Sequence, residues 1–162
     1  MHKNRTIIII SIFTIAVSFV VMVGWLFHIP ILQQVVPGFV SMVFNTAFCF
    51  VLYSAALLLT QYKTGKYGTA VFFVLALTGT FIGLITLLQF FFHFNTGLDQ
   101  LFVKDPEKIS TNHLYAGRMA FNAAINVFLF GLGLLMITVR HRLFNLIAQG
   151  TFHAVTFFAA IA

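Results

Sequence analysis

Polar side chains that could bind a ligand stand at the ends of long apolar runs in this chain. They are Asn45, Asn122, His28, His93, Arg118 and Asp99. An asparagine amide donates and accepts hydrogen bonds, while carboxylate and guanidinium groups add opposite charges. Because such groups are costly among apolar side chains, they are expected to face one another or a ligand in a shared layer. The sequence therefore predicts a ligand-binding site made of these residues.

The histidines and the asparagines also allow other interpretations. His28 and His93 could be the axial ligands of a haem, which would make the chain a membrane redox protein. Asn45 and Asn122 could instead cap helix starts or bridge neighbouring helices without binding a ligand. Both alternatives stay open at the level of sequence, which suggests no other cofactor and no metal site.

The composition places these residues in a membrane protein. Hydrophobic residues make up 60% of the chain and charged residues only 7%, whereas soluble domains carry about a quarter charged residues. Since so few charges cannot cover a water-facing surface, the expected solvent is the lipid bilayer. The basic residues behind the formal charge of +6 are spread over the ends of apolar runs, so they indicate membrane topology and no nucleic-acid partner.

Apolar runs predict an all-α, polytopic integral membrane protein with about five transmembrane helices. The expected spans cover residues 6–27, 42–60, 69–92, 119–139 and 143–162. The first run lacks the short apolar core and the small-residue cleavage site of a signal peptide, so we expect an uncleaved helix. Cys49, the only cysteine, lies inside the second run and is expected to be a small buried side chain.

Two polar connections are expected to carry short amphipathic helices at the membrane interface. Pro30 can start the first of them, and Pro37 with Gly38 would stop it. The second lies within 96–102 and is followed by a turn or a helix cap at 105–107. In the third span, the spacing Gly79-x-x-x-Gly83 is typical of closely packed helices.

Basic residues predict how the chain is oriented. The N-terminus and the connections 61–68 and 140–142 each carry two Lys or Arg, whereas the connection 28–41 carries none. The connection 93–118 carries Lys and Arg together with all the acidic residues, which count little in this rule. We therefore expect a multi-pass protein of the cell inner (plasma) membrane with a cytoplasmic N-terminus. The candidate site would then lie toward the outer side.

A stretch of the chain occurs twice. Residues 42–47 read M-V-F-N-T-A and residues 119–124 read M-A-F-N-A-A, and both continue as apolar runs. Upstream, Phe27-His28 matches Phe92-His93. A single transmembrane domain, residues 1–162, is therefore expected to contain about two and a half parallel helical-hairpin repeats. Repeat one covers about 6–61, repeat two about 69–140, and a partial third repeat 143–162.

The same stretches resemble a known class of membrane region. They read G-W-L-F-H-I-P-I-L-Q-Q-V-V-P-G-F, M-V-F-N-T-A-F-C-F-V-L, L-D-Q-L-F and G-R-M-A-F-N-A-A. They are similar to the multi-span N-terminal sensor regions of bacterial signalling proteins, which precede PAS, histidine kinase or diguanylate cyclase modules and carry a repeated M-x-P-N-T-A-like motif. Phe44 and Phe121 replace the usual proline, and Ala123 replaces threonine. The resemblance implies an input module, truncated or acting alone.

The function expected from these observations is sensory. The module would sense a small or membrane-soluble ligand at the outer side and signal to a cytoplasmic output or partner. Besides the lipid bilayer, its expected partners are a signalling protein or a second copy of the chain. No catalytic activity is expected in this chain, because it lacks a catalytic triad, an HExxH motif and a phosphate-binding loop. Haem-based redox chemistry and a small transport or structural role are the alternatives.

Overall fold

The computed structural model describes residues 4–34, 41–62, 64–103, 117–139 and 141–160. Every regular element in these ranges is a helix, which confirms the predicted all-α class. The elements are α1 (Arg5–Leu26), α2 (Pro30–Gln33), α3 (Phe44–Thr60), α4 (Lys66–Phe92), the 3₁₀ helix η1 (Leu98–Gln100), α5 (Phe121–Ile137) and α6 (Arg142–Ala160). Each predicted apolar run thus forms one long helix.

Three of these helices are suited to crossing a membrane. α1, α4 and α6 contain 22, 27 and 19 residues and are strongly apolar, which corresponds to lengths of about 28–40 Å. α3 and α5 are apolar but shorter, with 17 residues each. Large apolar side chains such as Phe13 and Val74 are 69% and 63% exposed, as expected for contact with lipid. The five-span, repeated architecture stays a prediction.

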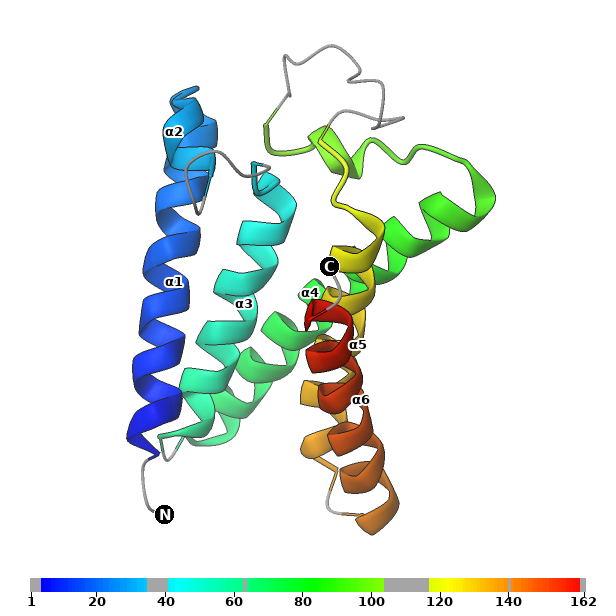
Figure 1. Ribbon diagram of the computed structural model, residues 1–162. Coiled ribbons are helices and arrows are strands. Elements are labelled where there is room, and N and C mark those ends of the chain that lie inside the picture. Colours follow the sequence, from blue (N-terminus) through cyan, green and yellow to red (C-terminus); the bar gives the residue numbers. More distant parts are fainter. Residues whose placement is uncertain (1–3, 35–40, 63, 104–116, 140, 161–162) are drawn as a thin grey trace.

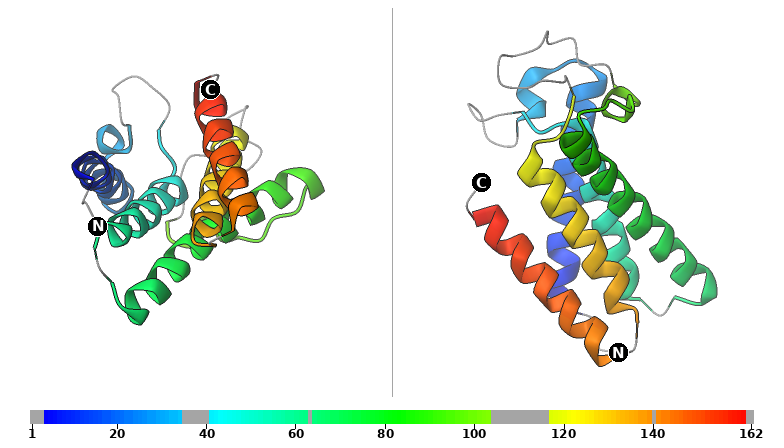
Figure 2. Two further views of the ribbon diagram at one scale, coloured as in Figure 1. Left: turned by 90° about the horizontal axis from the view of Figure 1, so that it is seen from below. Right: turned by 90° about the vertical axis from the view of Figure 1, so that its right-hand side faces the viewer.

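The long helices stand in a row in the order of the sequence. α1 packs against α3, α3 against α4, α4 against α5, and α5 against α6, and successive helices run in opposite directions (Figure 1). α1 and α6 occupy the two ends of the row (Figure 2, left). One broad face of each end helix is therefore not covered by the rest of the described chain.

Glycines allow three helices to meet around one tyrosine. Tyr53 of α3 is 3% exposed, and its hydroxyl donates a hydrogen bond of 2.7 Å to the Val127 carbonyl of α5. A Cβ atom at Gly79 would lie 2.5 Å from the Tyr53 Cε1 atom, and one at Gly83 would lie 2.8 Å from the backbone nitrogen of Phe128. The predicted Gly79-x-x-x-Gly83 spacing therefore serves close packing, of α4 against α3 at one glycine and against α5 at the other.

The contact between α1 and α3 is anchored by Trp25. Its indole Nε1 donates a hydrogen bond of 2.7 Å to the Met42 carbonyl just before α3. Ser18 and Ser11, which lie closer to the start of α1, are also buried, and their small side chains add little width to this face of the helix. The indole thereby satisfies a carbonyl near the start of α3 while its ring fills the interface.

The predicted interfacial segments are present in part. Pro30 is the first residue of α2, as expected for proline at a helix start, and η1 lies inside the predicted segment 96–102. The expected helix stop at Pro37 and Gly38, and the expected turn at 105–107, lie outside the described residues.

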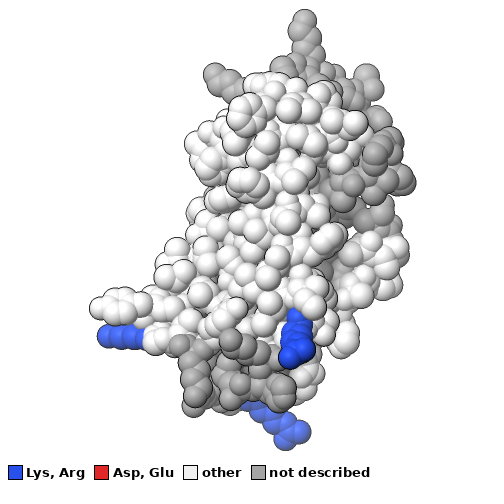
Figure 3. Space-filling view, turned by 90° about the vertical axis from the view of Figure 1, so that its left-hand side faces the viewer, with Lys and Arg blue, Asp and Glu red and all other residues white. Residues whose placement is uncertain are grey.

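Among the described residues, exposed Lys and Arg side chains gather at one end of the molecule. Arg5, Lys66 and Arg142 are the first residues of α1, α4 and α6, which all start at that end. Figure 3 shows Lys and Arg at that end of one face, which is otherwise uncharged where it is described. A cation at a helix N-terminus is opposed by the helix dipole, so helix stability does not account for these positions.

Candidate functional site

Three polar side chains meet at the end of the molecule opposite this positive charge. Gln89 lies one turn before the end of α4, Asp99 lies in η1, and Arg118 stands just before α5. All three are buried, with exposed fractions of 0%, 6% and 7%. We call Gln89, Asp99 and Arg118 the polar layer.

The centre of the polar layer is an ion pair. The Arg118 Nε atom donates to the Asp99 Oδ2 atom at 3.0 Å, and both side chains are almost completely buried. Removing two charges from water costs several kcal/mol per ion, and their attraction offsets this cost only with good geometry and further hydrogen bonds. The structure therefore brings the predicted site residues Asp99 and Arg118 together as an ion pair with no net charge. The stability of this buried pair depends on hydrogen bonds from neighbouring groups.

Arg118 has two further contacts that hold its guanidinium group. Its Nη2 atom donates to the Phe94 carbonyl at 3.3 Å. The guanidinium carbon lies 5.5 Å from the centre of the Phe90 ring, a cation–π contact. Arg118 thus links the end of α4, the connection after it and the start of α5.

Gln89 completes the polar layer from the α4 side. Its Nε2 atom donates to Thr96 Oγ1 at 2.8 Å and to Asp99 Oδ2 at 3.2 Å. Since an ionised carboxylate only accepts, the contact with Asp99 assigns the nitrogen to this side of the amide, and the Oε1 atom points elsewhere. Gln89 was not among the predicted site residues. An amide within an otherwise apolar stretch at the end of the third span is the signal that could have identified it.

Two oxygen atoms of the polar layer have no hydrogen-bond partner. Gln89 Oε1 and Asp99 Oδ1 are both buried, and neither has a hydrogen-bond partner among the described residues. Leaving a buried acceptor unpaired costs about 1–3 kcal/mol, and more for a charged group. Because Gln89 Nε2 bonds to Asp99, the two free oxygens belong to groups that touch. Each of the two oxygens can accept a hydrogen bond from a donor placed beside it.

Asn45 connects the other half of the molecule to this site. It is the second residue of α3, is 3% exposed, and its Nδ2 atom donates to the Leu98 carbonyl of η1 at 3.1 Å. Beside it, the Phe102 ring packs against the rings of Phe44 and Phe48, with centroids 5.6 and 5.2 Å apart. Asn45 therefore bridges α3 and η1, whereas Val43 holds the N-cap position of α3.

Asn122 behaves differently from its repeat partner. It is the second residue of α5, is half-buried, and its Oδ1 atom accepts a hydrogen bond from the backbone nitrogen of Ala123 at 2.8 Å. One turn further, the Oδ1 atom of Asn126 is buried without a hydrogen-bond partner. Asn122 therefore satisfies its own helix start and is not bonded to the polar layer.

The histidines end two helices and lie at the surface. His28 follows α1 and His93 follows α4, both exposed and both in the left-handed conformation, with φ of 55° and 54°. This conformation ends a helix and is uncommon for residues other than glycine. The ends of α1 and α4 stand on opposite sides of the molecule in two views (Figures 1 and 2). The two side chains are therefore not brought together within one chain.

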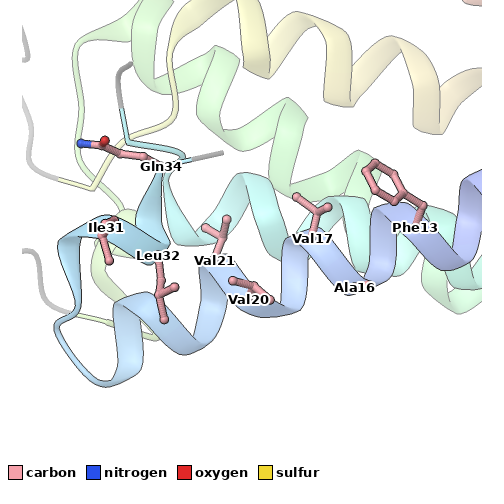
Figure 4. Close-up of a pocket in the computed structure, with 8 residues that line it drawn as sticks. All are labelled: Phe13, Ala16, Val17, Val20, Val21, Ile31, Leu32 and Gln34. Atoms are coloured by element: carbon pink, nitrogen blue, oxygen red, sulfur yellow. The ribbon is translucent and has the colours of Figure 1, made fainter. Parts of the chain in front are cut away.

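An apolar groove of about 310 Å³ lies beside this end of α1. Its lining side chains come from α1 and from α2 with the residue after it (Figure 4). They are Phe13, Ala16, Val17, Val20, Val21, Ile31, Leu32 and Gln34. The groove faces outward from the row of helices and shares no residue with the polar layer.

Comparisons with known proteins identify no relative. No family model, no curated protein and no solved structure matches the chain. The resemblance to bacterial sensor regions rests on sequence motifs alone. Within the described ranges, no three His, Cys, Asp or Glu side chains come together as metal ligands would.

Proposed function

We propose that this chain is a membrane-embedded sensory module whose polar layer binds a small ligand carrying a hydrogen-bond donor. One observation carries the proposal: Gln89 Oε1 and Asp99 Oδ1 are buried acceptors on groups that are hydrogen-bonded to each other, and neither atom has a partner in the part of the chain that the structure describes. A hydroxyl group could donate to one of these atoms and an ammonium group has enough donors for both, and the net neutral ion pair would not repel either group.

The packing of the helices supports a bilayer crossing by all five long helices. α3 and α5 have 17 residues each, at the lower end of the range for a span. α3 packs between α1 and α4, and α5 packs between α4 and α6, so each shorter helix lies against two longer ones. If the longer helices cross the bilayer, the shorter ones share their depth.

The charge distribution supports a cytoplasmic N-terminus. Arg5, Lys66 and Arg142 lie at one end, and helix dipoles disfavour all three positions. Retention of Lys and Arg on the cytoplasmic side accounts for them. The polar layer then lies toward the outer side, where it could meet ligands from the outer leaflet or beyond.

Matched contacts support the predicted duplication. In the first half, the Gln33 Nε2 atom donates to the Gly24 carbonyl at 3.4 Å. In the second half, Gly24 corresponds to Gln89 in the register that matches His28 with His93, and Gln33 corresponds to Asp99 when one extra residue is allowed after His93. Gln89 and Asp99 too are hydrogen-bonded to each other. In both halves, the end of an outward-running helix is thus hydrogen-bonded to the short helix that follows it. The polar layer contains this shared contact and adds an ion pair to it.

Ligand binding would be coupled to movement because the free oxygens are covered. A ligand can reach these buried atoms only when the structure around them opens, and the connection carrying η1 is the segment that holds Asp99. Asn45 and Phe102 attach this connection to α3, so the movement would reach both halves of the molecule. The signal would then pass along the helices to a cytoplasmic output or partner.

Thermal unfolding of the full chain in detergent tests this proposal. The probes are a polar bacterial lipid extract, rich in ammonium head groups, and a short-chain quinol, with the donor-free quinone as the control ligand. A probe at 100 times its dissociation constant stabilises by about 2.7 kcal/mol, which corresponds to a rise in Tm of about 5–10 °C for a chain of this size.

Two variants separate a site from a non-specific effect. Gln89→Met removes the free Oε1 atom at nearly constant volume and should abolish the rise in Tm. Thr86→Val removes a buried hydroxyl one turn away on α4 that is bonded to the Ile82 carbonyl, and should retain the rise. The proposal is wrong if neither donor-bearing probe raises Tm, or if Gln89→Met responds as fully as the unmodified chain.

A further inference from the structure

A line of polar side chains runs along α6. It consists of Arg142, Asn145, Gln149, His153 and Thr156. At 100° per residue, these positions fall within about 80° of one another around the helix axis. The spacing of three and four residues therefore places them on one face of α6, and we call this face the polar stripe.

The polar stripe lies beside the face of α6 that packs against the rest of the molecule. Its side chains are all exposed, while the neighbouring face, which includes the buried Ala148, packs against α5, where the Phe130 and Phe152 rings are 5.3 Å apart. Gly133 of α5 lies directly against Thr151 and Phe152. Asn145, Gln149 and His153 form no side-chain hydrogen bond with any described residue, while Thr156 bonds back to its own helix.

The depth of the stripe makes its exposure costly in a bilayer. Phe152 meets Phe130 in the middle of α5, so the neighbouring Gln149 and His153 share the depth of the α5 midpoint. Amide and imidazole groups at that depth normally face other helices, because lipid tails offer no hydrogen bonds. Only Arg142, at the start of α6, is placed to reach the head groups. The stripe therefore needs a polar helix surface opposite it.

We propose that the polar stripe is the contact surface between two copies of this chain. Both copies insert in the same direction, so a two-fold axis along the membrane normal would place their α6 helices parallel, with each stripe residue close to its own counterpart. Asn, Gln and neutral His each offer a donor and an acceptor, so like residues can bond to like. α6 stands at the end of the helix row, so no described helix blocks the approach.

Cysteine cross-linking in membranes tests this contact. In a Cys49→Ala background, which removes the only cysteine, Gln149→Cys and His153→Cys should give disulfide-linked dimers on mild oxidation. Val74→Cys on α4 is the matched control, because this residue is 63% exposed on another apolar helix. We expect at least tenfold less dimer from Val74→Cys. Equal yields, or cross-links from the stripe only to other proteins, would overturn the proposal.

A measurement of subunit number in lipid vesicles gives an independent test. Counting photobleaching steps at a series of protein-to-lipid ratios should show a dimer, and Gln149→Leu with His153→Leu should weaken dimerisation by about tenfold or more. Gln149→Asn should retain the dimer. Helix content should not change, because neither side chain forms a hydrogen bond with a described residue. A monomer at every ratio, or a dimer unaffected by the leucines, would show that the stripe is not a contact between copies.

Discussion

Asp99 and Arg118 form an ion pair that solvent barely reaches, and this burial determines how each side chain responds to substitution. Both side chains are at most 5% exposed. Gln89 Nε2 and the Phe94 carbonyl bond to the pair, so its remaining polar atoms are partly satisfied. Such pairs are weak sources of net stability, but they are very sensitive to the loss of one member.

We expect Asp99→Leu and Arg118→Leu each to destabilise the fold by about 3–5 kcal/mol, because each leaves an uncompensated buried charge. The double variant should lose about 1–3 kcal/mol less than the sum of the two single losses, which is the coupling energy of the pair. Chemical unfolding in mixed micelles measures all three variants. Additive losses would show that the two groups do not depend on each other.

The repeated asparagines illustrate why residue type alone does not determine a role. Asn45 and Asn122 hold the same position in their helices, yet one bonds across to η1 and the other to the neighbouring backbone nitrogen. The sequence indicated that both would be polar groups near helix starts. Their different partners depend on which connection folds over each helix, and that contact spans 53 residues for Asn45.

At the scale of elements, helix positions could be predicted closely because they depend on local properties. Apolar runs bounded by basic turns predicted the positions of the long helices, and Pro30 predicted the start of the short helix α2. The composition of the polar layer was predicted only in part: Asp99 and Arg118 were identified, and Gln89 was not. An amide on an apolar helix is noticeable in the sequence, but its partners come from a connection whose path is set by tertiary contacts.

The packing of α4 makes a testable prediction at this scale. Gly79→Ala should destabilise the fold by about 1–3 kcal/mol, because the added methyl group would press on the Tyr53 ring. Gly65→Ala, before the same helix, should be nearly neutral, since no atom lies within 4 Å of the added group. Thermal unfolding of both variants in the same detergent gives the comparison, and equal Tm values would contradict the packing.

At the scale of the whole molecule, the described residues place exposed Lys and Arg at one end of a row of apolar helices and the buried polar layer at the other. Arg5, Lys66 and Arg142 mark one end, and the polar layer, assembled from three segments of the chain, marks the other. Between them the described surface is dominated by exposed apolar side chains. A bilayer that the long helices cross accounts for all three features. It places the proposed ligand site and the proposed output on different sides of the membrane.

The most direct test of this account is labelling of single cysteines on intact cells with an impermeant thiol reagent. In a Cys49→Ala background, Asn95→Cys lies beside the polar layer and Thr64→Cys lies beside the positive end, and both positions are exposed. The account predicts that Asn95→Cys is labelled on intact cells and that Thr64→Cys is labelled only after the cells are opened. Labelling of Thr64→Cys alone would reverse the orientation, and labelling of both on intact cells would contradict a membrane crossing by the helix between them.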